Sequence, residues 1–397
     1  MDDEDFWNAK LGINEGEKPL HRYMSNNSVF YFSKPSRIQL HKQFVTMETT
    51  GEPAFVNVEE ARRRRDNFQG LNPCAEILLD SAGTCNLTTL NVTAFVRNGR
   101  LMLDELLEAQ RLSARIGYRM TLLDLELPGW DAVQKRDRLT GVSITGFQDA
   151  MDMLGYSMDQ QRELLAVLRK AAREAADEYA DALGTPRSLL VTTCKPEGTI
   201  SQLAGGVSSG VHFSHAPYYI RRIRINANDP LAQVASDLGW TMNPEVGQGF
   251  DPEHYGEVNW DDPNLRTVVI DFPIQSGATR TKYDVSAVEQ LETYKMFQEA
   301  YTEHNTSITV SVRDGEWKDA EQWVWDNWDS FVAVSFLSLD THTYQLAPYE
   351  AITEEEYHRL KDSMAAFDAA LLFAREKQEI EHDLDDPSCD TGICPIR

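Results

Sequence analysis

The sequence has few cysteines, a shortage of basic residues and no long apolar run. Five cysteines in 397 residues are too few for a disulfide scaffold. With 38 basic against 63 acidic side chains the formal charge is −25, which repels polyanions, so nucleic acid is not expected as a main partner. Apolar runs such as 331–339 are shorter than the roughly 20 residues that a membrane span requires.

The first residues are also unlike a secretion signal. Met1 is followed by four acidic residues, 2–5, where a signal peptide carries positive charge. We therefore expect a cytoplasmic protein without membrane contact. Hydrophobic residues make up 42% of the chain, which is enough for a sizeable core and excludes wholesale disorder.

Short β-branched runs alternate with longer helical patterns, which is typical of an α/β protein with parallel strands. We predict strands at 139–145, 188–193, 266–272, 307–312 and 331–339. We predict helices at 103–120, 159–183, 286–302 and 354–374.

Five parallel strands with crossover helices make either half of a large barrel or one open sheet. An isolated half-barrel leaves an exposed edge, so either another polypeptide completes it or the strand count is wrong. We expect residues 1–70 to lead into the half-barrel and 71–374 to form it. Residues 375–397 are acidic and lack apolar periodicity, which predicts a flexible solvated tail.

A first cluster of reactive side chains lies in Asn72-Pro73-Cys74-Ala75-Glu76, followed eleven residues after the cysteine by Cys85. In extended backbone, side chains two residues apart point to the same side. The amide of Asn72 and the carboxylate of Glu76 would then lie next to the sulfur of Cys74. The spacing alone equally allows a loop whose cysteine is a small buried hydrophobe.

A second cluster follows the strand that ends near Cys194. The turn Pro196-Glu197-Gly198-Thr199-Ile200-Ser201 presents backbone N–H groups and hydroxyls to a phosphate, although such turns are common. The third cluster is Cys389 and Cys394, near the end of the tail. Metal binding needs two more soft ligands and only His382 is near, so a dithiol that cycles to a disulfide fits better.

Together with Cys85-Asn86-Leu87 and His304-Asn305-Thr306-Ser307, these motifs occur in an order that resembles the ribonucleotide reductases. Cys74 and Cys85 are eleven residues apart, and Cys394 of the tail pair lies three residues before the last residue. These two features most resemble the monomeric, adenosylcobalamin-dependent class that reduces ribonucleoside triphosphates. The resemblance runs from about residue 21 to 397 and covers the C-terminal half of that enzyme.

The resemblance implies a ten-stranded α/β barrel with a central finger loop that carries Cys74. Cys74 would form the thiyl radical that removes the 3′-hydrogen of the ribose, and Glu76 would take the 3′-hydroxyl proton. Asn72 would hold the hydroxyls, and Cys85 would be one of two cysteines that deliver electrons. The residues 196–201 would hold the substrate phosphates, where Glu197 is an unfavourable neighbour for an anion.

The tail pair, Cys389 and Cys394, would reduce the resulting disulfide and be recharged by a thioredoxin-like reductant. The expected cofactor is adenosylcobalamin, for which the sequence indicates no pocket residues and no metal ligand. His212, His215 and His304 are interpreted as structural histidines.

The resemblance leaves out the first half of the barrel and the effector site. It also leaves Cys85 without its partner cysteine, because Cys194 matches no redox position. We therefore expect one part of a split enzyme of DNA-precursor synthesis, inactive without an N-terminal half. Alternatives are a fragment of a diiron or glycyl-radical reductase and a non-catalytic thiol subunit. The tyrosine pair Tyr218-Tyr219 and the tail glycine Gly392 are poorly placed for the first two. The retention of all four active-site residues argues against the third.

Overall fold

The structure is a computed structural model that describes residues 4–11, 25–339 and 345–376. The described chain divides into two compact units. The first comprises the described residues up to 217 together with 276–339, and the second comprises 218–275 together with 345–376. The predicted boundaries at 70 and 374 do not coincide with this division and stay predictions.

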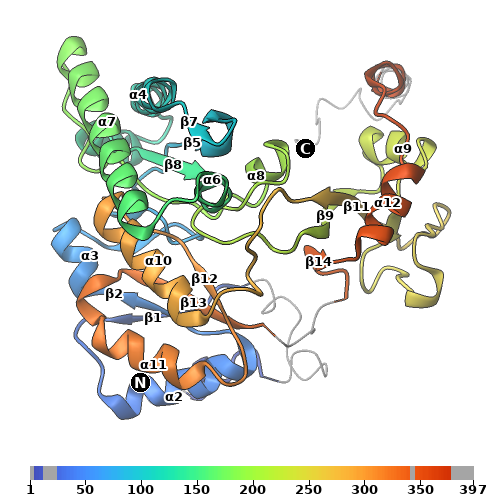
Figure 1. Cartoon of the computed structure of the whole chain (residues 1–397), viewed down its shortest axis with the longest axis horizontal. Coiled ribbons are helices and arrows are strands. Elements are labelled where there is room, and N and C mark those ends of the chain that lie inside the picture. The colour runs from blue at the N-terminus through green and yellow to red at the C-terminus, as the bar shows by residue number, and fades with distance from the viewer. Residues whose placement is uncertain (1–3, 12–24, 340–344, 377–397) are drawn as a thin grey trace. The chain divides into compact units, whose positions relative to one another are not determined.

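The first unit is built on one series of parallel strands (Figure 1). Strand β5 (Leu87–Asn91) pairs with β8 (Gly141–Thr145), and β12 (Thr309–Val312) pairs with β13 (Ala333–Ser338). Between these pairs runs the segment 190–194, which is joined by the parallel bridges Val142↔Thr192 and Cys194↔Thr306. The predicted strands at 139–145, 307–312 and 331–339 are therefore confirmed. The strand predicted at 188–193 is not a regular strand, because only Thr192 within it makes an isolated parallel bridge.

Two strands of opposite direction extend this series. Strand β13 pairs antiparallel with β2 (Ala54–Asn57), which pairs parallel with β1 (Ser28–Tyr31). Among the described residues β1 pairs only with β2, and β5 pairs only with β8, so both outer edges are open. All five residues of β5 are half-buried, as expected for an edge that nothing covers.

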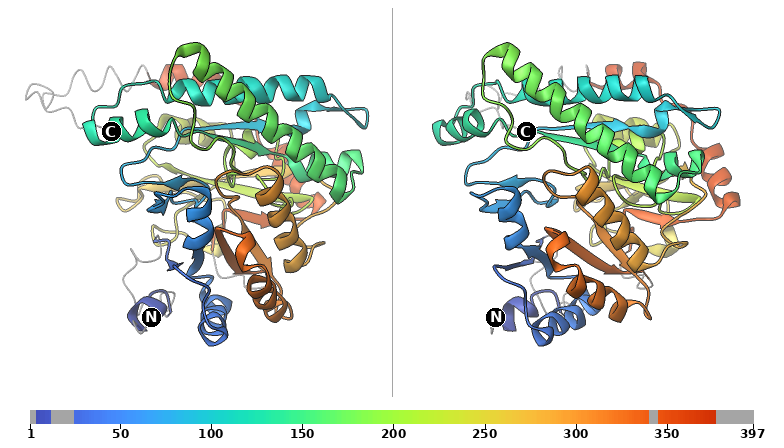
Figure 2. Two further views of the ribbon diagram at one scale, coloured as in Figure 1. Left: turned by 90° about the vertical axis from the view of Figure 1, so that its left-hand side faces the viewer. Right: turned by 60° about the vertical axis from the view of Figure 1, so that its left-hand side comes forward.

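Three of the predicted helices are confirmed: α4 (Leu103–Met120), α7 (Met158–Leu183) and α10 (Ala287–Ala300). Helix α7 begins with a capping box between Ser157 and Gln160 and ends at Gly184 in the left-handed conformation. It lies along α4, as Figure 2 shows, and its buried alanines allow the close approach. The other helices of this unit are α1 (Glu4–Trp7), α2 (Arg37–Thr50), α3 (Val58–Arg64), α5 (Pro128–Asp137), α6 (Phe147–Leu154), α8 (Ile200–Leu203) and α11 (Trp317–Asp326).

Two further sequence predictions are wrong. Residues 266–272 do not form a fifth parallel strand, because β11 (Thr267–Gln275) is antiparallel and belongs to the second unit. The missing parallel strand is β5, whose half-buried sequence Leu-Thr-Thr-Leu-Asn lacks the apolar run of a buried strand. The helix predicted at 354–374 is interrupted, since α12 (Glu354–Ser363) ends where Met364 turns to an extended conformation.

The second unit is a four-stranded antiparallel sheet in the order β10 (Met242–Pro244), β11, β9 (Tyr218–Asn226) and β14 (Tyr349–Ala351), with α9 (Pro230–Asp237) and α12. A buried ion pair joins β9 to β11, with 3.1 Å between Arg222 Nε and Asp271 Oδ1. The adjacent tyrosines 218 and 219 begin β9 and pack on the rings of Tyr357 and Tyr349. Their packing role is as expected.

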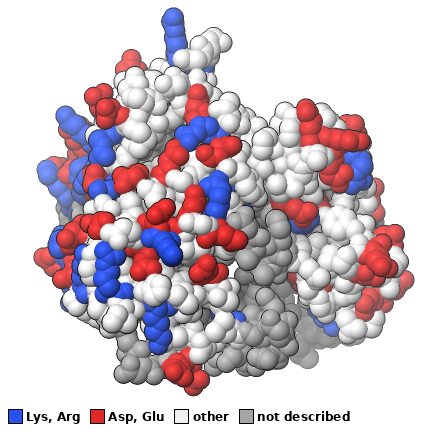
Figure 3. Space-filling view, turned by 60° about the horizontal axis from the view of Figure 1, so that its bottom comes forward, with Lys and Arg blue, Asp and Glu red and all other residues white. Residues whose placement is uncertain are grey.

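On the face drawn in Figure 3, basic and acidic side chains are interspersed, and neither forms an extended patch. No helix in the described ranges combines the length and apolar character needed to cross a membrane.

An aromatic cluster holds α2 against the strands of the first unit. The ring of Phe55 on β2 lies 5.5 Å from that of Phe44 and 6.1 Å from that of Phe336, and Phe55 is fully buried. We expect Phe55→Ala to lower the free energy of unfolding by about 3–5 kcal/mol, because the cavity cannot close fully. Urea unfolding followed by circular dichroism measures this change.

The control is Phe32→Ala, which removes a ring that is 65% exposed. This substitution should change stability by no more than about 0.5 kcal/mol. Equal losses in both variants would contradict the assignment of Phe55 to the core.

Candidate active site

The segment that carries Cys74 is a hairpin between β3 (Gly70–Leu71) and β4 (Leu78–Leu79), here called the finger loop (residues 70–79). Asn72 closes the loop from within, because its Oδ1 accepts a hydrogen bond of 2.9 Å from the Ile77 N–H. The Ala75 N–H donates to the Asn72 carbonyl at 2.8 Å, and Ala75 takes a φ of +62°. The expected finger loop is therefore present. Its backbone at 72–75 is a turn and not extended as predicted, so Cys74 is exposed whereas Glu76 is buried.

The finger loop packs directly on the parallel strands. A Cβ on Gly141 of β8 would lie 2.8 Å from Ile77 Cδ1 and 2.5 Å from Leu87 Cδ2. Glycine allows this approach, whereas a larger residue would require the side chains of Ile77 and Leu87 to move.

The two expected active-site thiols share one electrostatic environment. Cys74 and Cys85 are both exposed, and the negative charge of Glu76 raises the pKa of each thiol. The larger cause for both is that the surrounding protein removes part of the hydration of the thiolate. Together with Glu76, this loss of hydration raises the pKa of Cys85 to about 12. Lys195 acts in the opposite direction on both thiols. The structure thus brings Cys74, Glu76 and Cys85 together and adds Lys195, which sequence reasoning left out of the site.

Glu76 is the most unusual group of this site. Its side chain is fully buried, and neither carboxylate oxygen has a hydrogen-bond partner among the described residues. A buried carboxylate without donors is costly, so the arrangement favours a donor that comes from outside the described chain. A hydroxyl of a bound ligand next to Cys74 meets this requirement.

The predicted phosphate loop lies beside the same strands. Residues 196–201 follow the segment 190–194 and lead into α8, with Thr199 and Ile200 exposed. Glu197 is instead buried, and its carboxylate accepts a hydrogen bond from the Thr89 hydroxyl on β5. Burial raises the pKa of Glu197, which favours its neutral form and lessens its repulsion of an anion.

The remaining cysteines separate into two groups. Cys194 is buried in the main core, and burial raises its pKa well above the usual value, so it does not supply the partner of Cys85. Cys389 and Cys394 lie outside the described residues, and their redox role stays a prediction. Nowhere in the described ranges do three or more His, Cys, Asp or Glu residues cluster so as to hold a metal ion.

The basic run 62–65 differs from the solvated helix face that its sequence indicates. Arg65 is fully buried, pairs with Asp137 and donates a hydrogen bond of 2.8 Å to the Leu78 carbonyl of the finger loop. Arg64 donates at 2.8 Å to the Thr302 carbonyl beyond the end of α10. Apart from Glu60, four residues before Arg64, and Asn67, two residues after Arg65, the partners of these arginines are main-chain atoms or lie more than ten residues away in the chain. The sequence therefore does not distinguish the two from exposed arginines.

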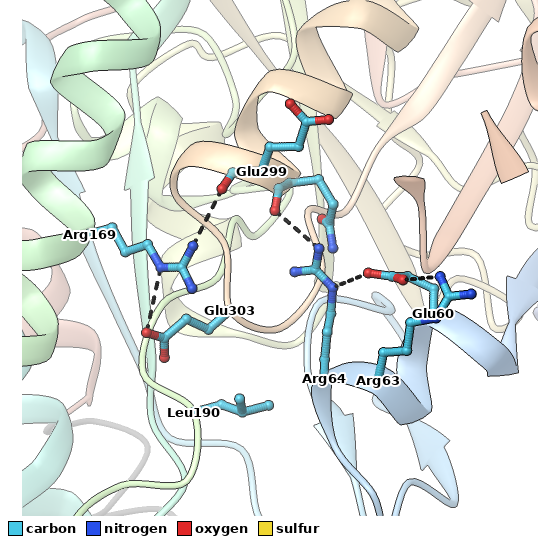
Figure 4. A pocket seen from close by; sticks show the side chains of 8 residues that line it. Glu60, Arg63, Arg64, Arg169, Leu190, Glu299 and Glu303 are labelled. Carbon is cyan, nitrogen blue, oxygen red and sulfur yellow. Dashed lines mark hydrogen bonds and ion pairs between the residues drawn. The ribbon is translucent and has the colours of Figure 1, made fainter. Parts of the chain in front are cut away.

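A hollow of about 360 Å³ lies beside Arg64 (Figure 4). Its arginines are compensated, since Arg64 pairs with Glu60 at 2.9 Å and Arg169 approaches Glu303 at 3.6 Å. Mixed and paired charges favour no class of ligand, and we assign the hollow no function.

Comparisons with known proteins agree with this geometry. The family described as "Ribonucleotide reductase, barrel domain" matches residues 14–188. An adenosylcobalamin-dependent ribonucleoside-triphosphate reductase of Lacticaseibacillus paracasei is 29% identical over 446 residues, and one of Lactobacillus leichmannii is 27% identical over 439. The chain is thus similar in sequence to adenosylcobalamin-dependent ribonucleoside-triphosphate reductases. The alignments cover 100% of this chain but only 55% and 56% of the two relatives, so the chain spans about half their length.

Solved structures confirm the fold. The crystal structure of a B12-dependent, class II ribonucleotide reductase matches with a TM-score of 0.75 at 24% identity, over 95% of this chain and 54% of that one. The alpha subunit of a class Id ribonucleotide reductase from Actinobacillus ureae matches with a TM-score of 0.51 at 15% identity, over 77% of this chain and 61% of that one. The prediction of an α/β fold that forms part of a reductase barrel is confirmed.

The shared electrostatics of the thiols can be tested in the chain alone. We expect Glu76→Gln to lower the pKa of Cys74 and Cys85, because the negative charge that disfavours both thiolates is removed. At a fixed pH near 8, each thiol should then react about two to ten times faster with iodoacetamide. Peptide mass spectrometry of the alkylated sites gives the rates.

Asp149→Asn is the matched control, because Asp149 is also a buried carboxylate with one unpartnered oxygen. It is not among the groups that shift the pKa of Cys74 or Cys85, so both alkylation rates should stay unchanged. Unchanged rates in Glu76→Gln would show that the carboxylate does not act on the thiols.

Proposed function

We propose that this chain is the thiol-bearing, C-terminal part of a ribonucleotide reductase that reduces ribonucleoside triphosphates to deoxyribonucleotides with adenosylcobalamin. The observation that carries the proposal is the buried carboxylate of Glu76, which has no hydrogen-bond partner among the described residues and whose charge acts on both thiols. A ribose brings the hydroxyl donors that this carboxylate lacks. The names of the relatives support the choice of substrate and cofactor.

The bound cofactor supplies a radical by homolysis of a weak cobalt–carbon bond. The exposure of Cys74 on the described chain fits a thiol that must exchange a hydrogen atom with such a group. We assign no residues to the cofactor pocket.

Each residue then has one role. The Cys74 thiyl radical takes the 3′-hydrogen of the ribose and returns a hydrogen atom at the end, so the thiyl radical is regenerated. Glu76 accepts the 3′-hydroxyl proton as an ionised base within hydrogen-bond reach. The 2′-hydroxyl leaves as water, and two thiols supply two electrons and two protons as they close to a disulfide.

The side-chain amide nitrogen of Asn72 is available to the substrate in this proposal. Its Oδ1 is used inside the finger loop, whereas its Nδ2 has no hydrogen bond to any described residue and can donate to a ribose hydroxyl. Backbone N–H groups and hydroxyls of 196–201 hold the phosphates in this proposal.

Cys85 provides one of the two reducing thiols, and the second comes from an N-terminal half. The open edges of β5 and β1 support this division, because unpaired strand edges are completed by pairing with another strand. Cys389 and Cys394 would reduce the disulfide by exchange and be recharged by a thioredoxin-like reductant. We expect the assembled enzyme in the cytoplasm.

The proposal predicts reduction of CTP only by the assembled enzyme. The chain is mixed with a candidate N-terminal half, adenosylcobalamin, dithiothreitol and labelled CTP, and deoxycytidine triphosphate is measured. Cys74→Ser should abolish the product, because an alcohol O–H bond is too strong for this hydrogen exchange. Glu76→Gln should lower the rate by about a hundredfold or more, as expected for loss of a general base.

The control is Cys194→Ser, which alters a core thiol that has no role in the proposed reaction. It should retain turnover wherever the variant folds. Product formed by the chain without a partner would disprove the split. Product that requires a diiron or glycyl-radical activator in place of adenosylcobalamin would overturn the cofactor.

A further inference from the structure

The side chains of Cys74 and Glu76 have no anchors of their own. Neither makes a hydrogen bond to a described residue, and both project from the turn of the finger loop. Their separation therefore depends on the backbone of 75–78. Ala75 holds a left-handed φ of +62°, which is disfavoured for a residue with a Cβ, so this turn has to be held from outside.

Two buried side chains hold the carbonyls of the turn. The Thr193 hydroxyl donates to the Glu76 carbonyl at 2.7 Å. Asn305 Nδ2 donates to the Ala75 carbonyl at 2.8 Å, and the Asn305 N–H donates to the Glu76 carbonyl at 3.2 Å. All of these partners come from the parallel strand segments and not from the finger loop itself.

The orientation of the Asn305 amide is fixed by a chain of hydrogen bonds that begins at Val332, the residue before β13. The Val332 N–H donates to the Tyr294 hydroxyl oxygen at 3.2 Å, so the hydroxyl proton is directed to Asn305 Oδ1 at 3.0 Å. Asn305 Nδ2 is thereby left to donate to Ala75. A reversed amide would break the hydrogen bonds to Tyr294 and Ala75, and a longer one of 3.4 Å to the Ala333 carbonyl, in a fully buried place.

His304 fixes the return strand of the finger loop. The Leu78 N–H can only donate, so His304 Nδ1, at 3.2 Å, is the acceptor. The Thr140 carbonyl can only accept, so Nε2, at 2.8 Å, carries the proton. Burial lowers the pKa of His304 to about 4, which keeps this neutral form at neutral pH. The Leu78 carbonyl is held on its other side by Arg65.

We propose that Thr193, His304 and Asn305 are positioning residues that hold the backbone of the finger loop, so that Cys74 and Glu76 face one substrate at a fixed separation. The inference rests on the proposed function for its catalytic consequence. Its structural content is independent of turnover, because the contacts exist in the chain alone.

The first test compares two neighbouring threonines. Thr193→Val removes the hydroxyl that holds Glu76, whereas Thr192→Val removes an equally buried hydroxyl that donates to the Tyr301 carbonyl at 2.6 Å and does not touch the finger loop. Hydrogen exchange is followed by mass spectrometry in peptides that cover 72–79. We expect exchange to rise at least about fivefold in Thr193→Val and to stay unchanged in Thr192→Val.

The second test separates the two bonds of His304. Asn at this position places an acceptor near Nδ1, and Gln places a donor near Nε2. His304→Asn should therefore keep the Leu78 amide protected, whereas His304→Gln should expose it to exchange. Equal protection in these two variants, or equal exchange in the two threonine variants, would overturn the inference. The histidine pair decides the question if a threonine variant fails to fold.

Turnover with the N-terminal half supplies the catalytic readout. Thr193→Val should lower kcat at least about tenfold and leave KM for CTP within about twofold, because the misplaced groups are those that react and not those that hold phosphate. A matched rise in KM without loss of kcat would contradict positioning. Absence of turnover in the unaltered pair would disprove the proposed function, while the exchange measurements would still decide the role of these residues.

Discussion

The structure depends on hydrogen bonds from buried strand side chains to the backbone of one short hairpin. The finger loop has two residues in each strand, which is too little to hold its own shape in water. Its stability comes from Thr193, His304 and Asn305, which lie where the parallel strand segments meet. Without the loop, His304 Nδ1 would lose its donor, and Thr193 and Asn305 would keep only their second acceptors, the Asn305 and Ala333 carbonyls. The loop and the strands therefore specify each other.

This dependence on the backbone explains how the side chains of Cys74 and Glu76 can remain without hydrogen bonds to the described residues. Cys74 and Glu76 are positioned through the main chain, which leaves the thiol and the carboxylate available to a substrate. A side chain hydrogen-bonded to protein would have to exchange that bond for one to the ribose. Positioning through the backbone avoids this cost and keeps the site preorganised.

The strand series of the first unit ends in two edges that pair with no further strand of the described residues. The two outer edges, β1 and β5, are at opposite ends of the series, and Thr89 on β5 also donates a hydrogen bond to Glu197 of the predicted phosphate loop. Whatever pairs with β5 therefore lies next to a residue that supports the phosphate loop. The half-length alignment with the relatives is consistent with a chain that needs a second part.

The sequence by itself determined the α/β class, the helices α4, α7 and α10, and the membership of Asn72, Cys74, Glu76 and Cys85 in one constellation, because these depend on local periodicity and on motif spacing. It could not determine that 266–272 belongs to a separate antiparallel sheet or that β5 replaces it, because strand direction is set by pairing partners distant in the chain. Nor could it show that Arg65 and His304 form hydrogen bonds with the backbone of Leu78, or that Glu197 is buried. Those features arise from contacts between residues far apart in sequence, and only the tertiary structure brings them together.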